Sequence, residues 1–159
     1  MPRQKKRLKD LEDILDYLRQ DPFYKEVLSI CTFNLVKDTK YLGMMNFKDF
    51  ENRHFVIEIN YKTSRRTFKE TVLHEFAHVL DCIAGNGKPF SVSSSKMEDA
   101  ILIENSYVDD IYYSKMEFFA ELFVISHGPT FKTMNLIYSY IAMNDLIIKA
   151  KENYQALFT

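Results

Sequence analysis

The chain has few of the residues that mark several common classes of protein. Its 159 residues include only two cysteines, four glycines and four prolines. The cysteines, Cys31 and Cys82, lie far apart and match no metal-binding spacing, which argues against a cysteine-ligated zinc module and a disulfide framework. We expect two free thiols, as in a reducing compartment. No repeat and no linker divides the sequence, so we predict a single domain over residues 1–159.

Long apolar runs and an excess of one charge are also absent. No apolar stretch reaches the length needed to span a membrane. The 21 basic and 22 acidic residues leave a net charge of −1, so the chain has no overall attraction for nucleic acid. The one basic cluster comprises Arg3, Lys5, Lys6, Arg7 and Lys9. We interpret this cluster as the solvated start of a helix rather than a patch for nucleic acid or membrane.

The segment that follows the basic cluster, Leu11-Glu12-Asp13, is charged where a secretory signal would be apolar. We therefore expect a cytoplasmic protein without a signal peptide. We also expect a monomer that has no nucleic-acid partner and no membrane partner.

Apolar periodicity predicts an α+β fold, with strands in the first half of the chain and helices after them. We expect helices over residues 7–20, 67–83, 116–126 and 130–158, and strands over 27–36, 41–47 and 55–61. Residues 1–20 would form an N-terminal helical extension. Residues 88–98, which are rich in serine, are expected to form a loop.

The most informative segment spells H-E-x-x-H, from His74 to His78, inside the helix predicted for residues 67–83. Histidines at positions i and i+4 project from one face of a helix, one turn apart. Their ring nitrogens can reach one zinc ion, while Glu75 lies beside them to carry a proton. The surrounding helix is apolar on nearly every side, and a buried helix needs partners for such polar groups. A metal ion would supply them; a helix with two half-buried histidines and a solvated glutamate is the alternative.

A catalytic zinc ion usually has three protein ligands and one open position. Glu117 is the candidate for the third ligand, because it begins a helix whose other residues are largely apolar. Glu121 follows one turn later on the same side, and Asp81 follows His78 on the first helix. Both carboxylates are candidates to orient a histidine ligand through its second nitrogen. The alternative for Glu117 and Glu121 is an exposed acidic stripe.

These motifs together resemble the lethal-factor-like zinc metallopeptidases, a family that includes bacterial Pro-Pro endopeptidases. The resemblance covers residues 50–159 and is carried by His74–Asp81, Ala84-Gly85 and Glu117–Phe123. It implies a zincin-like fold, with a small mixed sheet, an active-site helix and C-terminal helices. It also implies that His74, His78 and Glu117 bind Zn²⁺ and that Glu75 is the general base. By analogy with zincins, the strand at 55–61 would line the cleft as an edge strand.

The family also has a tyrosine upstream of the third ligand that assists the developing oxyanion. Asp110 occupies that position here, and the nearby tyrosines are Tyr107, Tyr112 and Tyr113. A short deletion before Met116 would bring Tyr112 into the role, and we favour it over Tyr113. Ordinary packing of tyrosines in a loop is the alternative.

The motifs predict a zinc endopeptidase that acts on a protein or peptide and in which Glu75 activates water. The resemblance implies that a tyrosine assists the oxyanion. The competing hypotheses are a non-catalytic binding module that keeps the zincin fold, and a nucleic-acid-binding protein that uses the basic N-terminus. A toxin delivered by a separate component, a phage protein and a housekeeping protease are all compatible with the sequence.

Overall fold

The computed structural model describes residues 2–37, 40–104, 115–128, 131 and 135–159 and shows an α+β protein with a small mixed sheet. The predicted fold class is thereby confirmed at this level. The chain divides into two compact units, Met1–Glu75 and Phe76–Thr159, whose boundary lies inside one helix. Within the described residues, no helix is both long enough and apolar enough to cross a membrane. The prediction of a single domain stays a prediction.

The first unit begins with helices α1 (Arg3–Leu18) and α2 (Pro22–Leu28). Asp21 caps α2, because its Oδ1 accepts hydrogen bonds from Phe23 N at 2.9 Å and Tyr24 N at 3.1 Å. The strand predicted for residues 27–36 is therefore wrong in its first part, where Val27 and Leu28 are helical. The Asp-Pro pair is a start signal for a helix, and it prevails over the β-branched composition that follows.

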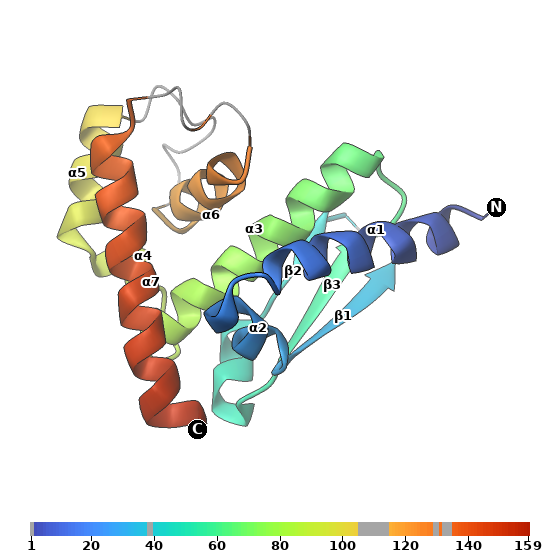
Figure 1. Ribbon diagram of the computed structural model, residues 1–159, viewed down its shortest axis with the longest axis horizontal. Coiled ribbons are helices and arrows are strands. Elements are labelled where there is room, and N and C mark those ends of the chain that lie inside the picture. The colour runs from blue at the N-terminus through green and yellow to red at the C-terminus, as the bar shows by residue number, and fades with distance from the viewer. Residues whose placement is uncertain (1, 38–39, 105–114, 129–130, 132–134) are drawn as a thin grey trace. The chain divides into compact units, whose positions relative to one another are not determined.

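The sheet of the first unit has the strand order β1–β3–β2 (Figure 1). Strand β1 (Cys31–Val36) pairs in parallel with β3 (Phe55–Asn60), and β2 (Gly43–Met44) pairs antiparallel with β3 on its other side. The predicted edge position of the 55–61 strand is therefore wrong, because β3 is the central strand. Phe55, Ile57 and Ile59 are fully buried on one face of β3, as the alternation predicted.

Between β2 and β3 lies the 3₁₀ helix η1 (Phe47–Asn52). It shortens the strand predicted for residues 41–47 to two residues. Asn46 caps η1 by accepting a hydrogen bond from Lys48 N at 2.9 Å. A local polar cap thus ends the strand sooner than the apolar pattern indicates.

Helix α3 (Arg65–Ala84) carries the H-E-x-x-H segment and runs through both units. Ser64 precedes it, and Ser64 Oγ accepts a hydrogen bond from Thr67 N at 3.1 Å. Gly85 follows its last residue, and a side chain does not fit there because a Cβ would lie 1.8 Å from the Lys88 carbonyl oxygen. The predicted helix over residues 67–83 is confirmed and extends slightly further at both ends.

The second unit continues with α4 (Phe90–Ser93), α5 (Ser95–Glu104), α6 (Lys115–Ser126) and α7 (Ile137–Phe158). Figure 1 shows α5 beside α7, and these two helices are in contact. The loop predicted for residues 88–98 is wrong, because Ser94 Oγ caps α5 by accepting from Met97 N at 3.1 Å. Helix α7 has no interruption near Asn144, and residues 130 and 132–134 of the helix predicted there lie outside the described residues.

Asn153 on α7 binds the C-terminal end of α3 and supports a first prediction. Its Nδ2 donates to the carbonyl oxygens of Ile83 and Ala84, at 2.9 Å each, and the side chain is buried. Asn153→Ala removes both donors from carbonyls of the last helical turn. We expect a loss of about 2–4 kcal/mol in the free energy of unfolding, measured by urea titration. Gln155→Ala, an exposed change on the same helix, is the control; equal midpoints for both variants would contradict this capping role.

Candidate metal centre

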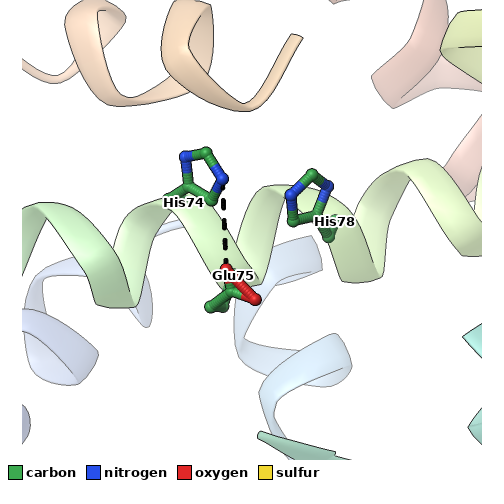
Figure 2. Close-up of side chains that lie close together, drawn as sticks. All are labelled: His74, Glu75 and His78. Atoms are coloured by element: carbon green, nitrogen blue, oxygen red, sulfur yellow. Dashed lines mark ion pairs between the residues drawn. The ribbon is translucent and has the colours of Figure 1, made fainter. Parts of the chain in front are cut away.

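His74, Glu75 and His78 form a compact group on α3. Each residue offers one ligand atom, and these atoms all lie within 4.8 Å of one another. Figure 2 shows the imidazole rings of His74 and His78 on one side of the helix, with Glu75 projecting separately. This arrangement follows from helix geometry, because i and i+4 share a face while i+1 is rotated by about 100°. The local structure therefore places two imidazoles and one carboxylate together.

The three side chains differ in their access to solvent. His74 keeps 19% of its side-chain surface exposed, whereas Glu75 keeps 8% and His78 keeps 9%. Glu75 Oε2 lies 4.0 Å from His74 Nε2, which exceeds hydrogen-bonding distance. Glu75 thus lies beside the histidine pair, in largely buried surroundings. A carboxylate in such a place has little bulk water around it and acts strongly on nearby polar groups.

Glu117 on helix α6 approaches His78, and both residues belong to the second unit. Its Oε1 lies 3.2 Å from His78 Nε2, and its side chain is 27% exposed. Glu117 stands in the first turn of α6, where a negative charge is favoured by the helix dipole. Phe118, Phe119 and Phe123 are fully buried on the same helix and fix its orientation. Tertiary packing therefore brings the carboxylate to one of the two histidines.

Asp81 is fully buried on α3, one turn after His78. Its two oxygens accept hydrogen bonds from Ser91, one from the backbone N at 2.8 Å and one from Oγ at 2.5 Å. Burial raises the pKa of the Asp81 carboxyl to about 6, although the bonds from Ser91 and the charge of His78 lower it. Asp81 therefore connects α3 to α4 close to a candidate ligand; its predicted bond to a histidine stays a prediction.

Ser91 is a residue that the sequence did not single out. It lies in a serine-rich segment that reads as a loop, and no periodicity or motif distinguishes it from its neighbours. In the structure it is fully buried and donates two hydrogen bonds to Asp81. Only the packing of α4 against the end of α3 identifies it.

The roles predicted for Glu121 and Tyr112 remain predictions. Glu121 lies on α6, one turn after Glu117, and is half-buried, so it is not part of a fully exposed acidic stripe. Its role in orienting a histidine is not decided by its position. Tyr112, favoured as the oxyanion helper, lies outside the described residues, as do Tyr107, Asp110 and Tyr113.

The distance between His78 and Glu117 is compatible with two ligands of a tetrahedral zinc ion. Ligand atoms about 2.0–2.1 Å from such an ion lie about 3.3 Å from one another. The 3.2 Å between His78 Nε2 and Glu117 Oε1 matches this spacing, and two imidazoles with one carboxylate are a common ligand set for catalytic zinc. His74, His78 and Glu117 therefore have the chemistry to hold the metal.

Comparison with known proteins does not place this chain in a family. No family model, no curated protein and no solved structure matches it. The interpretation of the site accordingly depends on its residues and their geometry.

Proposed function

We propose that this chain is a zinc-dependent endopeptidase with a zincin-like fold, related to the lethal-factor-like metallopeptidases. Zinc would be held by His74, His78 and Glu117, and Glu75 would be the general base. The observation that carries the proposal is the 3.2 Å approach of Glu117 to His78. An acidic side chain from a distant helix meets the H-E-x-x-H segment there, as a third ligand must.

The chemistry divides between the metal and Glu75. A zinc ion bound at this site supplies Lewis acidity to water and to a substrate carbonyl. Glu75 accepts a proton from the attacking water and then donates it to the departing amine. Its low exposure favours this role, because few solvent molecules compete for the carboxylate. Tyr112 remains our candidate for assisting the oxyanion.

The position of strand β2 at the edge of the sheet supports the proposal that the substrate is a peptide. Strand β2 pairs with β3 on one side only, and it lies at the end of the strand order in the described part of the chain. An extended peptide can add to such an edge by backbone hydrogen bonds. We therefore assign substrate pairing to β2 instead of β3.

Metal removal gives the direct test of this proposal. We expect the purified protein to contain about one equivalent of zinc and to cleave members of a mixed peptide library. A chelator should abolish cleavage, and added zinc should restore both cleavage and thermal stability, since binding to the folded state alone stabilises it by about 2.7 kcal/mol at 100 times Kd. Less than about half an equivalent of zinc after gentle purification would count against the metal site.

The peptide library also distinguishes the endopeptidase from the two competing hypotheses, a binding module and a nucleic-acid-binding protein. A binding module would retain zinc without releasing any peptide product. Salt-dependent binding of nucleic acid that disappears on removal of residues 1–9 would instead favour the basic cluster as the functional surface.

A further inference from the structure

Gly43 on β2 lies unusually close to helix α3. A Cβ atom at this position would be 2.7 Å from Thr71 Cγ2 and 2.8 Å from Glu75 Cγ, both shorter than real Cβ contacts. It would also be 3.3 Å from the carbonyl oxygen of Glu58. The φ angle of Gly43 is not positive, so other residues could adopt its backbone conformation. Glycine is needed here because a side chain has no space. The backbone of Gly43, which has no side chain, therefore packs against Cγ of Glu75.

Neither contacting surface is free to move away. Thr71 and Glu75 are i and i+4 on one stripe of α3, and both are buried. Thr71 is β-branched, and its Oγ1 donates to the Thr67 carbonyl oxygen at 2.7 Å, which restricts the position of its methyl group. On the other side, Gly43 is paired with the fully buried Ile59 of β3.

We propose that Gly43 is a positioning residue for Glu75, an inference that rests on the proposed function. The backbone of β2 forms a wall against Glu75 Cγ and limits the side-chain rotamers that the carboxylate can adopt. Any side chain at position 43 pushes on Cγ, which lies in the middle of the glutamate and cannot swing aside like a flexible end. The expected consequence is a displaced general base on an intact helix.

Gly43→Ala tests this role together with Thr71→Ser. The serine keeps the Oγ1 bond to Thr67 and removes Cγ2, which is one of the two overlapping atoms. We expect Gly43→Ala to lower kcat by about 10–100-fold with little change in KM or zinc content, because small displacements of a reacting group are costly. In the double variant, thermal stability should recover while kcat stays low, since the overlap with Glu75 remains.

Two results would overturn the proposal. One is a wild-type kcat in Gly43→Ala, and the other is recovery of kcat in the double variant, which would trace the loss to Thr71 alone. If Gly43→Ala does not fold, the double variant, which has one overlap fewer, provides the measurement. Val56→Ala, an exposed change on the neighbouring strand β3, is the matched control and should keep the wild-type kcat.

A spectroscopic measurement separates this inference from the proposed function. The side-chain carboxyl ¹³C signal of Glu75, assigned by its loss in Glu75→Gln, reports on the carboxylate without any substrate. We expect it to shift in Gly43→Ala and in the double variant, and not in Thr71→Ser or Val56→Ala. An unshifted signal rejects the positioning role, whereas a shifted signal in a protein without peptidase activity rejects only the endopeptidase.

Discussion

Glu75→Gln is expected to lower kcat for peptide hydrolysis by about 10³-fold or more while the zinc content stays unchanged. The amide has nearly the same size as the carboxylate but cannot accept the proton of the attacking water, and a general base contributes about 10²–10⁴-fold. Glu75 is buried and packed against Gly43, so an isosteric change preserves the contact. The measurement is kcat on the best library peptide, alongside metal analysis of the same sample.

The control for this variant is Glu70→Gln, which lies on the same helix but is exposed and forms an ion pair with Arg66 at 3.7 Å. It should retain full activity. If Glu75→Gln keeps activity within about threefold of wild type, Glu75 is not the base. If it loses zinc, Glu75 is a ligand, which its place in the compact group also permits.

Glu117→Ala should weaken zinc binding by more than about 100-fold and abolish hydrolysis. The proposed site has three ligands, and Glu117 supplies its only negative charge, so its removal leaves two neutral imidazoles to hold a divalent ion. Even partners that merely orient a ligand contribute about 10–100-fold to metal affinity, and loss of a ligand should cost more. Competition with a chromogenic chelator measures the change in Kd.

Glu98→Ala is the matched control, because Glu98 is exposed and pairs with Lys115 at the start of α6, 3.4 Å away. It removes a carboxylate from the same unit without approaching the histidines, so zinc affinity should not change. Wild-type affinity in Glu117→Ala would dismiss the three-ligand arrangement. Comparison with Glu75→Gln then identifies the carboxylate that binds the metal.

The contrast between α3 and the serine-rich segment shows which elements can be read from the sequence. The helices over 67–83 and 116–126 and the strand over 55–61 agree closely with α3, α6 and β3. Each has a sustained apolar pattern and a clear polar or glycine boundary. The predictions for residues 27–28 and for most of residues 88–98 failed, because Asp21 and Ser94 cap helices α2 and α5 against the composition. The rest of the predicted strand, residues 31–36, is strand β1.

The sequence alone determined the local half of the candidate site. Two histidines at i and i+4 share a helix face whatever surrounds them, so the positions of His74, Glu75 and His78 follow once α3 forms. Long-range packing decided the rest, because no local rule relates residues far apart in the chain. It brought Glu117 to His78, Ser91 to Asp81 and the backbone of Gly43 to Glu75, through contacts that exist only when separate elements bury their apolar faces together.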